Sequence, residues 1–417
     1  MQEWLGTFKA QQFMKMRFNI LWVSLLVLAI LSCERDPSPE QADRFIKFYG
    51  EYLMDEARDM AALDDGGFAI CGVDSLPDLG KRMVLVITDE YGNLRSGFPK
   101  YYTEGDLNSA ANSIVPIRGG QGGFLLAGYI EQPVEGAFST QKDIFLVKVS
   151  STGAISNQES FGTKDDEVIL SAAPGIVSGY VLAGYKVRDG RTDILVVGVD
   201  QELNQWDLPF NLTPLFSKRR ANFILNAGDR YLCACVAELP GDFSGNTQTT
   251  LLSFDDNLNP IPEYLSSGSS NEGGISVVGD GPNEYLVLAT RIISGRSDIV
   301  VYKIETDEAT PKIISSDLLT TISESGVDLR AKGIVKTADG RYAIVGTREA
   351  GGDQKIFLQF LGSDYDPEDL IIYGAAGDQS AADIVLAEDD GIVLLGTNSV
   401  EESSMISLIK TNGSGGL

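Results

Sequence analysis

The chain has 417 residues, no histidine and a formal net charge of −26 at pH 7. Without histidine it can hold neither a Ser-His-Asp nor a Cys-His nucleophile pair, and no His-ligated zinc ion. The negative charge argues against a nucleic-acid partner, which requires a basic surface. With 43% hydrophobic and 22% charged residues, the chain is expected to fold around a core.

Residues 1–32 have the pattern of an export signal. Lys15 and Arg17 precede the run Ile20–Leu31, which is apolar except for Ser24. A positive start, an apolar stretch and a small residue before the cleavage point are typical of a secretory signal. The run is shorter than the about 20 residues of a membrane span. Residues 33–43, rich in proline, serine and acidic side chains, are predicted to form a tether.

Cys33 stands at the predicted cleavage point, and the segment Ile30-Leu31-Ser32-Cys33 resembles the lipobox of bacterial lipoproteins. The resemblance implies that Cys33 is acylated and that its acyl chains hold the protein on a membrane. Glu34 and Asp36 beside it favour the outer membrane, on the cell surface or the periplasmic side. An ordinary signal peptide or a membrane anchor is the alternative.

Three cysteines follow this segment, namely Cys71, Cys233 and Cys235. An odd number argues against a disulfide framework in an exported protein. Cys233 and Cys235 are two residues apart in an apolar run, where a bridge between them would be strained. We therefore predict buried thiols rather than a disulfide, metal or redox site.

Seven segments repeat an aromatic or aliphatic opening residue, an apolar run and a small residue. The openers are spaced by 56, 56, 51, 54, 57 and 50 residues, and they are Phe68, Phe124, Tyr180, Tyr231, Tyr285, Tyr342 and Ile392. Another strand-like stretch precedes each opener, a second apolar run follows it, and a shorter polar stretch closes most units. Turn pairs such as Gly66-Gly67 and Asp390-Gly391 mark tight hairpins. Each unit is therefore about four strands.

The two middle strands of each unit are apolar on both faces, so each sheet must be covered on both sides. Sheets packed side by side around an axis meet this need. We predict an all-β, seven-bladed β-propeller over residues 44–412, with a tail at 413–417. Residues 44–50 resemble 369–374 and are predicted to complete the last blade as its outer strand. An open solenoid would leave two apolar end faces uncovered.

The repeats resemble those of bacterial lipoprotein propellers, which have the form Asp-Gly-Gly-aromatic-apolar-apolar-apolar-Gly. Gly122–Gly128 and Asp339–Gly346 are the best copies, and the fourth unit departs from the form because Cys235 replaces its closing glycine. The resemblance implies the propeller fold. It says little about activity, since propellers carry many functions.

Acidic residues recur 13 or 14 positions before the openers, where loops lead into the first strand of a blade. They are Asp55, Asp166, Glu272, Asp328 and Asp378. If these carboxylates face a common funnel, they would suit a ligand or a hard cation such as Ca²⁺. The other interpretation is that each one bonds a local backbone turn or the next blade.

Long loops between the second and third strands carry Tyr129, Phe138 and Phe243 among glycine, glutamine and threonine. Exposed aromatics with amides and hydroxyls suit sugars or peptides; ordinary long loops are the alternative. We therefore expect a monomeric, lipid-anchored, non-enzymatic binding module for a protein or glycan, with no required cofactor. The alternative is a carbohydrate-active enzyme that uses two carboxylates across the funnel.

Overall fold

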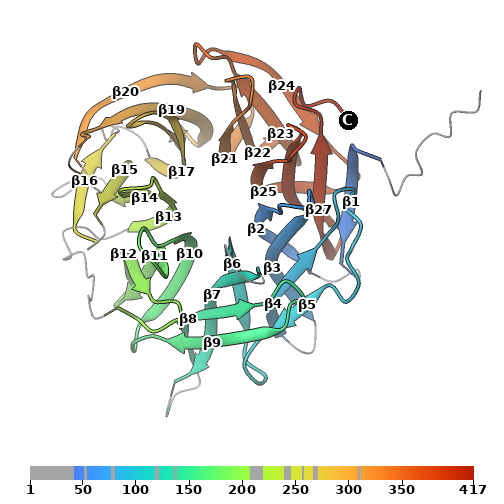
Figure 1. Ribbon diagram of the computed structural model, residues 1–417. Helices are drawn as coiled ribbons and strands as arrows, with labels where there is room; N and C mark the ends of the chain where they lie inside the picture. Colours follow the sequence, from blue (N-terminus) through green and yellow to red (C-terminus); the bar gives the residue numbers. More distant parts are fainter. Residues whose placement is uncertain are drawn as a thin grey trace, which may run out of the picture. The chain divides into compact units, whose positions relative to one another are not determined.

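The computed structural model describes residues 42–50, 54–76, 80–117, 122–134, 136, 139–206, 219–238, 246–255, 258–265, 271–308, 310 and 312–417. Residues Asp43–Leu417 form one compact unit, which is a seven-bladed β-propeller (Figure 1). Six blades are four-stranded antiparallel sheets. The third blade shows β10, β11 and β12 within the described ranges, and a bridge from Val199 to Gln205 continues its outer edge. The predicted fold is confirmed.

The strands fall into four sets by their place in the blade. The innermost strands are β2 (Glu56–Ala62), β6 (Ser109–Pro116), β10 (Asp166–Pro174), β13 (Arg219–Asn226), β17 (Asn271–Gly281), β21 (Asp328–Lys336) and β25 (Asp378–Leu386). The second strands are β3 (Phe68–Leu76), β7 (Phe124–Pro133), β11 (Tyr180–Arg188), β14 (Tyr231–Glu238), β18 (Glu284–Ile293), β22 (Tyr342–Ala350) and β26 (Ile392–Val400). The third strands are β4 (Gly80–Ile87), β8 (Thr140–Val149), β12 (Arg191–Val199), β15 (Thr247–Phe254), β19 (Arg296–Thr306), β23 (Asp353–Leu361) and β27 (Ser403–Thr411). The outer strands are β1 (Phe45–Tyr49), β5 (Lys100–Tyr102), β9 (Ile155–Phe161), β16 (Pro260–Tyr264), β20 (Ile313–Ile322) and β24 (Pro367–Tyr373).

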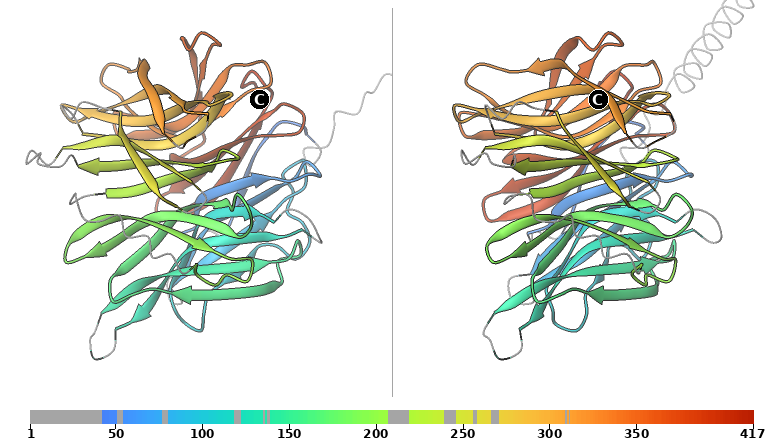
Figure 2. Two further views of the ribbon diagram at one scale, coloured as in Figure 1. Left: turned by 60° about the vertical axis from the view of Figure 1, so that its left-hand side comes forward. Right: turned by 90° about the vertical axis from the view of Figure 1, so that its left-hand side faces the viewer.

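Alternate residues of the middle strands pack against different neighbouring blades. On β3, for example, Cys71 packs toward Leu126 of the second blade, whereas Ile70 packs toward Val393 of the last blade. Seven apolar clusters result within the described residues, each between two adjacent blades. This arrangement explains why the middle strands lack the polar alternation of a sheet with one wet face. The edge-on views in Figure 2 show the blades packed face to face.

The N-terminal strand closes the ring. β1 pairs with β27 in antiparallel register from Phe45–Lys410 to Tyr49–Ile406, so the last sheet has the order β1-β27-β26-β25. The Tyr49 hydroxyl donates a 2.7 Å hydrogen bond to the carbonyl of Gly92 in the first blade. The outer strands of the first and sixth blades use Tyr102 and Tyr373 in the same way, toward glycine carbonyls of the next blade. The predicted closing strand is confirmed.

The three described cysteines are free and buried, as predicted. The sulfur atoms of Cys233 and Cys235 are 3.6 Å apart on β14, which is too far for a disulfide bond. Across the described ranges, no helix is long and apolar enough to cross a membrane.

Candidate functional site

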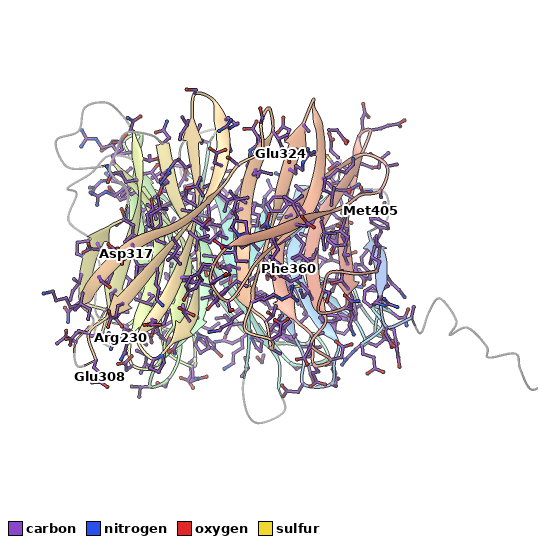
Figure 3. All side chains as sticks on the ribbon, turned by 90° about the horizontal axis from the view of Figure 1, so that it is seen from above. Arg230, Glu308, Asp317, Glu324, Phe360 and Met405 are labelled. Atoms are coloured by element: carbon purple, nitrogen blue, oxygen red, sulfur yellow. The ribbon has the colours of Figure 1, made fainter. Side chains whose placement is uncertain are left out.

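The innermost strands of the seven blades stand around the centre of the ring (Figure 1). They surround a central channel of about 1120 Å³, to which all seven blades contribute lining residues. This volume slightly exceeds the range of about 300–1,000 Å³ that is usual for small-molecule sites. We refer to the end at which the seven innermost strands begin as the start rim. In Figure 3, Glu324, just before β21, lies at the start rim, and Arg230, in the turn after β13, lies at the opposite rim.

Every innermost strand has a β-bulge where it pairs with the second strand of its blade. The extra residue of a bulge is unpaired, and a bulge can redirect its side chain. All seven extra residues line the channel, and we call them the bulge ring: Arg58, Asn112, Leu170, Asn222, Ile275, Lys332 and Ala382. The same bulge in every blade thus brings seven side chains of six residue types to the channel lining.

Two members of the bulge ring are amides that connect neighbouring blades. The Asn112 side-chain nitrogen donates a 2.7 Å hydrogen bond to the carbonyl of Ile169 on β10. The Asn222 side-chain nitrogen donates one of the same length to the carbonyl of Gly274 on β17. Both amides are therefore held in place through their nitrogens. Their side-chain oxygens can accept hydrogen bonds from a ligand in the channel.

Three cations from three different blades reach the channel: Arg58 on β2, Arg220 on β13 and Lys332 on β21. Glu56 also lines it and forms a 2.6 Å ion pair with Arg58. The pKa of Lys332 is lowered, first by desolvation between the channel walls and then by the charge of Arg58. Arg220 and Lys332 keep accessible surface in the channel, and among the described residues neither has an ion-pair partner. Of the six ionisable residues that line the channel, three are thus cations and three are acids, Glu56, Asp59 and Asp383.

Two half-buried tyrosines outside the channel lining lie within electrostatic reach of these charges, each five residues after the opener of its second strand. Burial raises the pKa of Tyr129 on β7, and the charge of Arg58 opposes that rise. Burial also raises the pKa of Tyr185 on β11, and the charge of Arg220 opposes it. The Lys142 ammonium lies 4.4 Å from the centroid of the Tyr129 ring. Tyrosine rings beside guanidinium groups form a surface that can stack on a flat ligand.

Two carboxyl groups meet at the junction of the last and first blades. Asp59 follows the bulge of β2, Asp383 follows the bulge of β25, and the two side chains are hydrogen-bonded. Burial raises the pKa of both, and the charge of Asp59 adds to the rise for Asp383. A hydrogen bond between two carboxyl groups requires a proton on one of them, and the raised pKa of both favours that form. The pair was not identified from the sequence.

The same position after the bulge connects further blades around the channel. Asp59 accepts hydrogen bonds from the Ser113 hydroxyl at 2.8 Å and the Ile114 backbone N–H at 2.9 Å. The Ser113 and Ser171 hydroxyls accept backbone N–H groups from the blades that follow them. Asp383 accepts the Met60 N–H at 3.1 Å. These residues hold the innermost strands together at one level of the ring, so the carboxyl pair is part of the frame.

The acids predicted 14 positions before the openers hold adjacent blades together. Asp166, Asp328 and Asp378 accept hydrogen bonds from backbone N–H groups on the third strand of the preceding blade, at 2.9, 2.6 and 3.1 Å respectively. Asn108 and Asn271 make the same contact at 2.8 and 3.0 Å. The recurrence found in the sequence therefore coincides with an inter-blade hydrogen bond.

The two acids predicted 13 positions before the openers are buried. Glu272 bonds Arg291 at 2.6 Å, the Tyr302 hydroxyl at 2.6 Å and the Thr249 hydroxyl at 2.7 Å. Asp55 is held through its backbone, which exchanges hydrogen bonds with Ser404. Of the five predicted acids, all of them described, none lines the channel. Their role in ligand binding remains a prediction that the geometry does not test.

Phe138, Phe243 and Cys33 lie outside the described residues. Tyr129 is described and lies near the channel charges, as given above. In the part of the chain that the structure describes, no group of three or more His, Cys, Asp or Glu side chains is placed to hold a metal ion. The bulge ring was missed by the sequence analysis. The signal available for it was a set of charged or amide residues nine to twelve positions before several openers.

No protein-family model and no curated protein matches the chain. Solved structures with a similar fold include a polysaccharide lyase described as an ulvan lyase, at 12% identity over 76% of this chain and 80% of that one, with a TM-score of 0.48. The Nup133 β-propeller domain of Vanderwaltozyma polyspora has 10% identity over 85% and 94%, with a TM-score of 0.45. A luciferin-regenerating enzyme has 12% identity over 88% and 97%, also with a TM-score of 0.45. At such low similarity no activity is transferred from these proteins to this chain.

Proposed function

We propose that this protein is an exported, lipid-anchored β-propeller that binds a protein or glycan without converting it, and that the ligand binds at the start rim of the channel. The observation that carries the proposal is the bulge ring. It holds cations, amides and apolar side chains in fixed positions on a rigid frame, beside Tyr129 and Tyr185. Rigid elements that present several polar groups to one cavity are typical of binding sites.

The carboxyl pair in the channel does not have the spacing of a glycosidase. Such enzymes hold their two carboxyl groups about 5–10 Å apart, so that a sugar or a water molecule fits between them. Asp59 and Asp383 are hydrogen-bonded to each other and also to Ser113, Ile114 and Met60. This contact supports a role in closing the ring, and it is why binding is preferred to the enzymatic alternative.

Export and anchoring rest on the resemblance of residues 30–33 to a lipobox, with Cys33 as the acylated residue. The expected location is the outer membrane. Metabolic labelling with an alkyne fatty acid tests this: the full chain should take up the label and sediment with membranes, and Cys33→Ala should lose both properties. A Cys33→Ala protein that is still labelled would contradict the assignment.

Binding is tested with the full chain in detergent micelles, applied to an array of glycans and to a pull-down from extracellular protein. Tyr185→Ala should weaken capture of the bound ligand at least tenfold, because it removes a ring from the start rim. Tyr101→Ala, a partly exposed tyrosine of the outer strand β5, is the control and should leave capture unchanged. Equal capture by the two variants would show that the ligand binds elsewhere.

A further inference from the structure

We propose that the ligand of the channel is an acidic saccharide, whose carboxylate or sulfate group is held by Arg58, Arg220 and Lys332. The proposal deepens the function above and rests on it. It names the chemical class of the ligand, which the fold alone leaves open.

The electrostatics of the channel favour an anionic group. Arg58, Arg220 and Lys332 come from the first, fourth and sixth blades, so they surround the axis. Glu56 offsets the charge of Arg58 through its ion pair. Burial raises the pKa of both carboxyl groups of the pair Asp59–Asp383, which favours their uncharged forms. Arg220 and Lys332 have no such neutralising contact among the described residues.

The lowered pKa of Lys332 has a consequence for binding. Desolvation and the arginine charges, that of Arg58 first, disfavour its charged form, whereas the charge of Glu56 favours it. An anion bound between the cations would offset both effects, because an opposite charge nearby favours the charged form of Lys332. An anionic group in the channel would therefore relieve the repulsion between Lys332 and the arginine side chains.

The neighbouring side chains point to a sugar as the carrier of that group. Asn112 and Asn222 keep their nitrogens on backbone carbonyls, which leaves side-chain oxygens as acceptors for hydroxyl groups. Tyr129 and Tyr185 lie outside the channel lining on the second strands β7 and β11, where a pyranose that extends from the channel over the start rim would meet them. Hydroxyl donors, a flat apolar face and a negative group occur together in uronic acids and sulfated sugars.

Calorimetric titration of the full chain in detergent tests the proposal. The probes are trigalacturonate, a hyaluronan tetrasaccharide and a sulfated chondroitin tetrasaccharide, each paired with its carboxyl-reduced or desulfated counterpart. A triglutamate peptide serves as a non-saccharide anion. We expect at least one acidic saccharide to bind, its neutral counterpart to bind at least tenfold more weakly, and triglutamate to bind no better than the neutral sugar.

Arg220→Gln and Lys332→Gln should each weaken binding of the acidic saccharide about tenfold, as expected for loss of a charged hydrogen bond. Lys148→Gln removes the same charge from the third strand β8, outside the channel lining, and should leave the Kd unchanged. Failure of all three acidic probes, equal binding of the neutral counterparts, or triglutamate binding as tightly would each overturn the proposal. If a neutral glycan binds and Tyr185→Ala abolishes it, the proposed function survives and only the acidic class is wrong.

Discussion

The closing strand offers a sharp test of how the ring is held together, because two phenylalanines of the same strand face opposite ways. Phe45 is 7% exposed and packs into the cluster between the last and first blades, against the turn at Gly92. Phe48 is 40% exposed on the outside of β1. Replacing either by alanine changes strand propensity by the same amount, so the difference between the variants isolates burial.

Phe45→Ala should lower the free energy of unfolding by about 3–5 kcal/mol, as expected for an aromatic ring removed from a packed core. Phe48→Ala should cost about 1 kcal/mol or less, because its ring remains largely in water. Urea unfolding of the two variants, monitored by intrinsic fluorescence, measures this difference. The midpoints are compared for variants whose unfolding free energy depends on urea concentration with the same slope. Equal shifts of the midpoint would mean that β1 does not close the last blade in solution.

Three further predictions concern contacts between blades. Tyr373→Phe should cost about 1 kcal/mol, since it removes one hydrogen bond to the Gly415 carbonyl; an unchanged urea midpoint would argue against that bond. Asp328→Ala should cost about 1–2 kcal/mol by leaving the Ser297 N–H unpaired, whereas Asp328→Asn keeps an acceptor and should be near neutral; a larger loss for the asparagine variant would point to a role of the charge. For Asp383→Asn the difference from the parent should depend on pH. The raised pKa means that the folded parent binds more protons than its unfolded chain above the ordinary aspartate pKa of about 4, so parent stability falls as pH rises through the raised value. The variant lacks this loss, so the urea midpoint of the variant should rise relative to that of the parent as the pH increases above about 4. A difference that does not depend on pH would contradict the shared proton.

Much of the fold could be predicted because every blade buries its two middle strands, and the apolar runs of these strands recur in the sequence. Phe68, Tyr180 and Ile392 begin their second strands as predicted, since an apolar run covered on both faces has no polar alternation to obscure it. The closing strand was predictable for a related reason. Residues 44–50 resemble 369–374, and both Tyr49 and Tyr373 donate to a glycine carbonyl of the next blade.

The channel could not be predicted in the same way. A bulge adds one residue to a strand, and whether it occurs depends on pairing with the next strand rather than on local composition. Lys332 therefore appears in the sequence as one charge in a polar strand, with nothing to say that it points to the axis. Asp59 and Asp383 come from opposite ends of the chain, and only ring closure brings them together.

The predicted acids lie either 13 or 14 positions before their openers, and this difference of one residue gives them different surroundings in the structure. Successive side chains of a strand point to opposite faces. Asp328, 14 positions before its opener, thus reaches the backbone of the preceding blade, whereas Glu272, 13 positions before its opener, is buried against Arg291. The five acids therefore form two sets, which occupy opposite faces of the strand.

In a propeller, structural and functional positions can be told apart by whether the same residue type recurs in every blade. A residue type that recurs at one register position serves what all blades share, which is contact with the next blade; Asp166, Asp328 and Asp378 do so. Recognition of an asymmetric ligand needs the opposite, positions where the backbone repeats and the side chain differs. The bulge ring has this property, because the same bulge presents Arg58, Leu170 and Lys332 to one channel. Specificity in this propeller should therefore change through substitutions at the bulges, while the frame that holds them remains intact.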